Sequence, residues 1–396
     1  SKPYRADFTL TKLTQSDKRF LLFGLGDPQP DNSDHIQRFR TEAVPDVKKI
    51  SAKYSIPQVG IALGDILGKG DAQTFTSMKR AFGETGVPFF TTIGNHDKSS
   101  VDYTGDTYRD VLGPRWYSFN RGDVHIVSMD NIIHECQESA GYTGGFSAEQ
   151  YEWLKQDLSY VPKDKMVILC VHIPFRNSKY AYYDEVLELL SQYKYATIMS
   201  AHTHSNINHI HTKNGKEIFE HVTGTSCGAW WRSTVCTEGT PIGFGIYRIE
   251  GAAMKEWNYK SVQHGEDFQI RLYRGSDKFT GGGDASYYFS KKNAGQIVAN
   301  IWNWDPAWTV NVYENGAKTG TMTQYSDKDA WTVAYHIGIL NNSSSYNKAT
   351  DHMFYYTLTN PDADVKVEAI DRFGNKYEQT VFTDPDSHPG IYHLDY

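Results

Sequence analysis

The chain has 396 residues, more than one hydrophobic core usually serves, so we expect two domains. Its 40 Lys and Arg against 47 Asp and Glu give a formal charge of −7 without a long run of either sign, and the sequence therefore carries no nucleic-acid footprint. The longest apolar runs are about six residues, against the roughly 18 to 20 that cross a bilayer, so we expect no transmembrane segment.

The first part of the chain alternates short apolar runs with segments of helical spacing. The predicted strands lie at residues 20–26, 59–63 and 88–93, and the predicted helices between them at residues 33–54 and 72–82. This alternation is typical of an α/β fold with parallel strands.

The middle of the chain continues the pattern after a hairpin. The hairpin strands are predicted at residues 116–120 and 124–129, and two further strands at residues 166–171 and 196–200. Ser147 followed three residues later by Gln150 predicts the capped start of a helix that precedes the third of these strands.

Helical spacing is absent beyond about residue 246, except in brief pieces. Short strands separated by turns are predicted at residues 296–301, 309–313, 353–357 and 365–370. We therefore predict one domain over residues 1–262 and a smaller, all-β accessory domain over residues 263–396.

Residue types that bind metals stand where the predicted strands end. The central motif is Gly94-Asn95-His96-Asp97, which follows the strand at 88–93. Asn95 offers a carbonyl oxygen to a hard metal ion, His96 can give or take a proton, and Asp97 can fix the tautomer of that imidazole.

Four other strand ends carry similar residues, namely Asp27 with Gln29, Asp65, His172, and His202 with His204. A pair of divalent ions about 3.5 to 4 Å apart is held by one bridging carboxylate with imidazole and amide ligands around it. These residue types are the ones that such a site requires. A lone His-x-His pair or Gly-Asp turn is more often structural, but five such motifs in order make chance an unsatisfactory explanation.

In this order the motifs resemble the signature of the calcineurin-like metallophosphoesterases: DxH, GDxx, GNH[DE], a solitary His and GHxH. The resemblance covers roughly residues 18–260. It implies an α/β fold in which a β-sandwich is flanked by helices (α/β/β/α), followed here by the smaller all-β domain.

The resemblance also implies two divalent metal ions, which could be Mn, Fe, Zn or Mg. The implied ligands of the first ion are Asp27, Gln29, Asp65 and His204, and those of the second are Asp65, Asn95, His172 and His202. His96 would face the substrate phosphate, oriented by Asp97. Ala201 replaces the usual Gly before the last motif, a small change, whereas Gln29 replaces a His and leaves either a weaker oxygen ligand or none.

The function implied is hydrolysis of a phosphate monoester or diester by attack of a metal-bridging hydroxide, with His96 stabilising the transition state or protonating the leaving oxygen. The alternative is a catalytically weak protein of the same fold that acts as a glycan or cell-surface binding module, and the Gln29 departure favours it. The motifs leave the ester open: a nucleotide, a lipid headgroup or a sugar phosphate.

The tail carries a second resemblance. Residues 299–306 and 351–356 are similar to the C-terminal β-domain of secreted bacterial members of the family, which often carry an N-terminal β-domain as well. We therefore expect an exported protein, periplasmic or at the cell surface, without the N-terminal β-domain that such members carry.

Several other residues admit two interpretations. Trp230 and Trp231 either line a substrate cleft or pack against the second domain, and Cys227 and Cys236 either form a disulfide or stay free. Arg176 and Arg232 could neutralise a phosphate but as single arginines are more often solvated.

Overall fold

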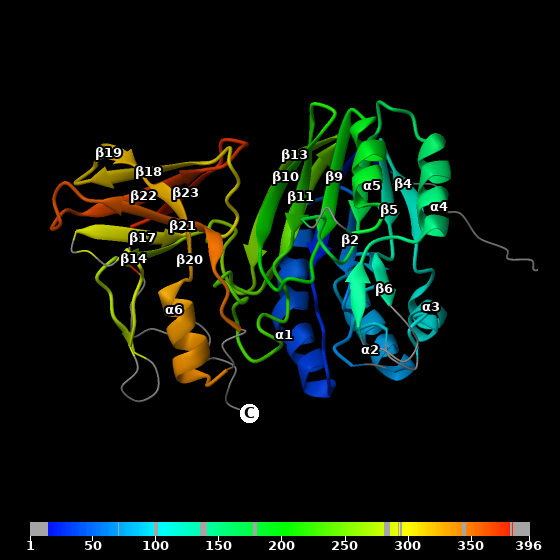
Figure 1. The fold of residues 1–396 in the computed structure, drawn as a ribbon, viewed down its shortest axis with the longest axis horizontal. Coiled ribbons are helices and arrows are strands. Elements are labelled where there is room, and N and C mark those ends of the chain that lie inside the picture. Colours follow the sequence, from blue (N-terminus) through cyan, green and yellow to red (C-terminus); the bar gives the residue numbers. More distant parts are fainter. Residues whose placement is uncertain are drawn as a thin grey trace, which may run out of the picture.

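The computed structural model describes residues 15–69, 71–98, 102–134, 141–176, 180–280, 286–291, 293, 295–342, 346–380 and 382. A larger body of sheets and helices lies beside a smaller body built mainly of strands (Figure 1). In the described part of the chain, no helix is both long and apolar enough to cross a membrane.

Two sheets form the centre of the larger body. The first has the order β13-β12-β1-β2-β3, with bounds β13 Ala253–Ser261, β12 Gly243–Glu250, β1 Arg19–Leu25, β2 Gln58–Leu63 and β3 Phe89–Thr92. The second has the order β10-β11-β9-β8-β5-β4, with bounds β10 Ile207–Lys213, β11 Lys216–Val222, β9 Tyr195–Ser200, β8 Met166–Cys170, β5 Val124–Ser128 and β4 Tyr117–Arg121. Strands β1, β2 and β3 are parallel, as are β5, β8, β9 and β11.

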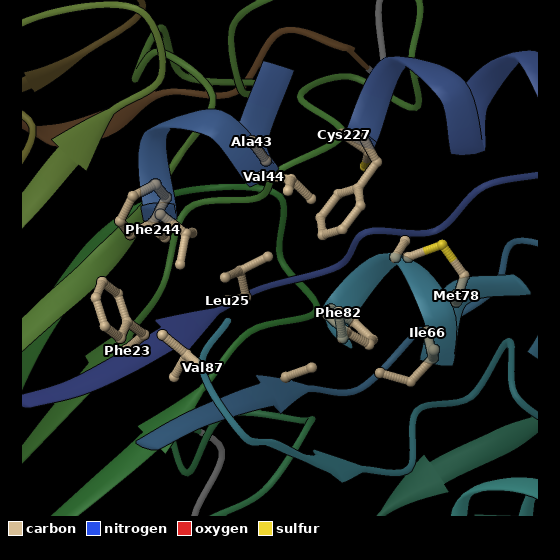
Figure 2. Packing of buried hydrophobic residues seen from close by; sticks show 14 of the residues in the cluster. Phe23, Leu25, Ala43, Val44, Ile66, Met78, Phe82, Val87, Cys227 and Phe244 are labelled. Atoms are coloured by element: carbon tan, nitrogen blue, oxygen red, sulfur yellow. The ribbon is translucent and has the colours of Figure 1, made fainter. Parts of the chain in front are cut away.

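Helices cover the outer face of each sheet. The helices are α1 Ser33–Ser51, α2 Ala72–Glu84, α3 Asp106–Leu112, α4 Ala148–Ser159 and α5 Tyr183–Ser191. Buried side chains of α1, α2 and α3 pack on the first sheet, and Figure 2 shows part of this core around Phe23, Phe82 and Phe244. Side chains of α4 and α5 pack on the second sheet, and a third core fills the space between the sheets. The predicted α/β/β/α sandwich is therefore confirmed.

Local sequence explains where most of these helices begin. Asn32 precedes α1 and accepts hydrogen bonds from the backbone nitrogens of Asp34 and His35, and Ser147 and Gln150 form the predicted capping box of α4. Helices α3 and α5 are absent from the sequence prediction because each is short, and the glycine and tyrosine at their N-caps make no side-chain capping bond.

The smaller body is a sandwich of two four-stranded antiparallel sheets. One has the order β14-β17-β21-β20, with bounds Arg271–Arg274, Gln296–Asn300, Thr350–Thr357 and Thr323–Asp327, and the other has the order β19-β18-β22-β23, with bounds Ala317–Thr321, Thr309–Glu314, Val365–Ile370 and Lys376–Gln379. The strand pairs β6 Ile132–His134 with β7 Tyr142–Gly144 and β15 Phe279–Thr280 with β16 Ser286–Tyr287 lie outside the main sheets. This antiparallel architecture confirms the predicted β character of the C-terminal region, which also holds a short helical stretch, α6 Ala330–Val333 continued by a π-helical turn at Ala334–Ile339.

The two bodies are joined by buried hydrogen bonds. Asn206 Nδ2 donates to the carbonyl oxygen of Trp302 at 2.7 Å, and Asn208 Nδ2 donates to that of Asn303 at 2.9 Å. Strand β13 of the larger body ends at Ser261 and β14 of the smaller body begins at Arg271. The proposed division at residues 262 and 263 stays a prediction.

Candidate metal centre

The predicted site residues follow the carboxyl ends of parallel strands in both sheets. Asp27 and Asp65 follow β1 and β2, and Asn95 follows β3. His172 and His202 follow β8 and β9 of the facing sheet. The carboxyl ends of parallel strands meet at one edge of each sheet, and here the two edges face each other.

Asp65 is the centre of the cluster. Its Oδ1 accepts a hydrogen bond from the backbone nitrogen of His96 at 2.8 Å and lies 3.3 Å from Nε2 of His172. Ligand atoms of Asp65, His172 and His202 all lie within 4.8 Å of one another. Burial raises the pKa of Asp65, but the charge and hydrogen bond of His172 outweigh burial and hold it well below its usual range.

Asp27 supplies an unsatisfied oxygen at the same place. Its side chain is fully buried, and among the described residues its Oδ1 has no hydrogen-bond partner. That oxygen lies 3.9 Å from Nε2 of His172 and 3.7 Å from Nε2 of His204, while Oδ2 accepts from the backbone nitrogen of His202 at 3.0 Å. Burial raises the pKa of Asp27 to about 8. A cation among these atoms would satisfy the orphaned oxygen, so the donor set fits a divalent metal.

Backbone carbonyls turn the imidazoles toward the centre. His172 Nδ1 lies 2.8 Å from the carbonyl oxygen of Leu63, and His204 Nδ1 lies 2.8 Å from that of Gly228. When such a ring is neutral, an Nδ1 that donates to a carbonyl leaves the lone pair on Nε2, which is the tautomer that binds a metal. Burial lowers the pKa of His172, but the carboxylates of Asp65 and Asp27 raise it to about 9, so a metal would have to displace its Nε2 proton.

The remaining imidazole faces another ring nitrogen. His202 Nδ1 lies 3.2 Å from Nε2 of His172, and that same nitrogen lies 3.1 Å from Oδ1 of Asn95. Burial and the neighbouring His172 lower the pKa of His202 to about 3, and burial lowers the pKa of His204 to about 4, so both rings stay neutral. Two nitrogen lone pairs at this separation repel unless they share a proton or a cation.

Gln29 lies in the cluster but turns its oxygen away from it. Its Nε2 donates to Asp65 Oδ2 at 3.4 Å, and its Oε1 lies 3.9 Å from the sulfur of Cys227. In this rotamer the amide contacts the central carboxylate through its nitrogen, and the role of Gln29 as a metal ligand stays a prediction.

The predicted partnership of His96 and Asp97 is wrong. His96 Nδ1 lies 2.9 Å from the carbonyl oxygen of Gly68, which orients the exposed ring. The oxygens of the buried Asp97 accept from the backbone nitrogens of Leu67 at 3.0 Å and Gly94 at 2.8 Å. Asp97 therefore braces the two loops that carry Asp65 and His96 and does not orient the imidazole.

The backbone at the site is held in conformations that side-chain-bearing residues seldom adopt. Positive φ angles occur at Asp27, Gln29, Asp65, His202 and His204. Such conformations persist only where the surroundings enforce them, and they concentrate at functional sites. Two glycines near the site leave no room for a side chain. A Cβ at Gly94 would collide with the backbone of Asp65, and one at Gly64 would collide with the ring of His172.

Asn131 supports the centre and was missed as a functional residue. Its Oδ1 accepts from the backbone nitrogens of both His172 and Ile173 at 3.1 Å, and its Nδ2 donates to Tyr183 Oη at 2.6 Å. The signal in the sequence was its place three residues beyond the end of strand β5 (Val124–Ser128), but an asparagine there carries no motif that distinguishes it from a turn residue.

Asp130, next to Asn131, forms a buried ion pair with Lys98. The carboxylate lies 2.8 Å from Nζ of Lys98 and 3.4 Å from the guanidinium of Arg115. Lys98 directly follows Asp97, so this pairing fixes the end of the Gly94-Asn95-His96-Asp97 loop.

The structure distinguishes between the two interpretations that the sequence left open for the tryptophans, arginines and cysteines. Trp231 is buried and donates from Nε1 to the carbonyl oxygen of Pro28, whereas Trp230 is partly exposed and stacks on His204 with centroids 4.1 Å apart. Arg176 and Arg232 are exposed, and Cys227 and Cys236 are free buried thiols and form no disulfide.

Family comparisons agree with this geometry. A model described as Calcineurin-like phosphoesterase matches residues 23–206, and one described as C terminal of Calcineurin-like phosphoesterase matches residues 220–377. The chain belongs to the calcineurin-like phosphoesterase family. The C-terminal match begins in strand β11, so it includes the last strands of the larger body.

Curated relatives of this family member match over limited stretches. Purple acid phosphatase 18 of Arabidopsis thaliana is 26% identical over 152 residues, covering 33% of this chain and 32% of the relative. "Probable glycerophosphodiester phosphodiesterase GpdQ" of Arcobacter nitrofigilis is 28% identical over 126 residues, covering 30% of this chain and 42% of the relative. The chain thus spans less than half the length of either relative.

Solved structures of similar fold include purple acid phosphatase PPD1 from yellow lupin, with a TM-score of 0.40 and 16% identity over 59% of this chain and 50% of that one. A 5'-nucleotidase precursor from Thermus thermophilus has a TM-score of 0.39 and 10% identity over 61% of this chain and 54% of that one. At this similarity the structures add nothing to the family assignment.

Proposed function

We propose that the protein is a metal-dependent phosphoesterase that holds two divalent ions. The observation that carries this proposal is the cluster of the buried Asp27, Asp65 and His172 with the partly buried His202, in which Asp27 Oδ1 has no hydrogen-bond partner among the described residues and lies near imidazole nitrogens. Ions bound there would supply an activated water and positive charge opposite the phosphate oxygens.

The residues of the chain divide the remaining work. Asp65 supplies negative charge at the centre, and Asp27 would supply more once a cation displaces its proton. The carbonyl oxygens of Leu63 and Gly228 accept from Nδ1 of His172 and His204 and so direct Nε2 of each ring toward the metal. His96 is exposed and its Nδ1 donates to the carbonyl oxygen of Gly68, so its Nε2 is the atom that would contact a phosphate oxygen or protonate the leaving oxygen.

Both classes of ester are candidate substrates. Among the relatives, the purple acid phosphatases are named as phosphatases and the Arcobacter protein as a phosphodiesterase. We propose a small phosphate ester as the substrate, and export from the cell, expected from the sequence, stays a proposal that fractionation of the producing cells would test.

The deciding experiment measures metal content and hydrolysis together. The purified chain is analysed for bound metals and then incubated with p-nitrophenyl phosphate and bis(p-nitrophenyl) phosphate, each with added Mn²⁺, Zn²⁺ or Mg²⁺. His172→Ala should abolish metal binding and turnover, whereas His209→Ala, on strand β10, should leave both unchanged. A protein that binds metals tightly but hydrolyses neither ester would refute the proposal and favour the binding-module alternative.

A further inference from the structure

The smaller body reaches the candidate metal centre through residues 346–348, just before β21. Lys348 Nζ donates to the carbonyl oxygen of Thr203 at 2.8 Å, and Thr203 stands between His202 and His204. The backbone nitrogen of Lys348 donates to Thr237, whose own backbone nitrogen donates to His204. A lysine distant in sequence is therefore tied to the loop that carries two of the proposed ligands.

Residues 346–348 are also held in place by contacts on the side away from Thr203. The carbonyl oxygen of Tyr346 lies 2.6 Å from Nδ1 of His336, and Nε2 of that ring lies 2.7 Å from Oγ of Ser233. The Tyr346 ring packs edge-on against Trp230 with centroids 4.9 Å apart, and Trp230 in turn stacks on His204. These contacts hold Lys348 beside the metal centre before a ligand binds. The lysine therefore loses little conformational entropy when it binds a ligand.

Lys348 presents an ammonium beside the loop that carries His202 and His204. Lys348 keeps exposed surface, yet surrounding protein lowers its pKa by burial, while the carboxylates of Glu238 and Asp27 raise it. An ammonium has three donors, and within the described ranges of the chain one of them is used, on Thr203, which leaves two for an anion.

We propose that Lys348 is a substrate-binding residue whose ammonium binds a phosphate oxygen and favours doubly charged phosphomonoesters over singly charged diesters. This inference rests on the proposed function and adds to it a contribution of the C-terminal body to specificity. A cation beside the centre interacts more strongly with the second negative charge that a monoester carries and a diester lacks.

The test compares Lys348→Met, which keeps most of the stem without the charge, with Lys348→Arg, which keeps the charge. Lys155→Met is the matched control, since Lys155 lies on α4 in an exposed pair with Glu152. Each full-length variant, loaded with Mn²⁺, is titrated calorimetrically with inorganic phosphate. KM and kcat are then measured for p-nitrophenyl phosphate and bis(p-nitrophenyl) phosphate, alongside metal content and thermal midpoint.

Lys348→Met should weaken phosphate binding by about 10- to 100-fold, the effect of one charge-assisted hydrogen bond, and should raise KM for the monoester more than for the diester. Lys348→Arg should restore most of the affinity, and Lys155→Met should match the unmodified protein. Unchanged phosphate affinity and ester preference in Lys348→Met would overturn the assignment. So would equal losses on both esters accompanied by lost metal, because these would indicate a purely structural tie to Thr203.

Failure of the proposed function gives a different result. An unmodified protein that hydrolyses neither ester refutes the phosphoesterase activity, and the phosphate titration then still decides for or against Lys348 as an anion-binding residue.

Discussion

Gln29 Nε2 donates to Asp65 Oδ2 at 3.4 Å, so the residue that departs from the family signature contacts the central carboxylate through its nitrogen. Its oxygen, the atom that could bind a metal, lies beside the Cys227 thiol. An amide placed this way would contribute less to a cation than an imidazole would, so we expect an ion on the Asp27 side to be held more weakly than one on the Asn95 side.

Gln29→His should therefore tighten metal binding on that side by roughly tenfold and reduce the dependence of activity on added Mn²⁺. The measurement is Mn²⁺ affinity by calorimetry together with metal content after dialysis. Gln37→His, an exposed position on α1, controls for the added imidazole. Two equally tight ions in the unmodified protein would contradict the expectation.

His96→Ala should lower kcat by roughly 10² to 10⁴ and leave metal content nearly unchanged, because the carbonyl oxygen of Gly68 orients the exposed ring and the proposed ligand set does not include it. Steady-state kinetics and elemental analysis on the same sample check this. If the metals are lost, His96 has a ligand role that the structure does not indicate.

Asp97→Asn tests the corrected role of that residue. Since both carboxylate oxygens accept from backbone nitrogens, an amide can replace only one of them and presents a donor to the other. We expect a loss of about 1–3 kcal/mol in the free energy of unfolding, measured by denaturant titration. A variant with unchanged stability and only a shifted pH profile would restore Asp97 as the partner of His96.

Asp65→Asn should prevent assembly of the paired site, because a neutral amide cannot bridge two cations as a carboxylate does. The substitution is isosteric and the backbone N–H of His96 can still donate to the remaining oxygen, so the fold should persist. Elemental analysis of variant protein with an unchanged circular dichroism spectrum gives the answer, and two tightly bound ions would refute the bridging role.

Asn131→Ala should destabilise the fold by about 1–3 kcal/mol and loosen metal binding, since it strips partners from the buried backbone nitrogens of His172 and Ile173. Chemical denaturation and Mn²⁺ affinity are the measurements. Gln37→Ala, at an exposed position on α1, is the control. Equal stability of the two variants would show that water replaces the lost bonds at no cost.

The sequence alone determined the alternation of strands and helices and the residues at the strand ends, because each strand is a short apolar run with polar residues just after it. The sandwich and the grouping of Asp27, Asp65, Asn95, His172 and His202 came from the family resemblance, since the strand pattern does not say which sheet edges face each other. The small β body was also predictable, because its alternation is local.

Only the tertiary structure decided which atoms meet. Asp97 lies next to His96 in sequence yet bonds to Leu67 and Gly94, and the carbonyl that orients His96 belongs to Gly68. Lys348 approaches Thr203 across 145 positions of sequence. Side-chain direction at a turn is set by backbone dihedrals and by the packing of distant segments, and neither is encoded in the spacing of a motif.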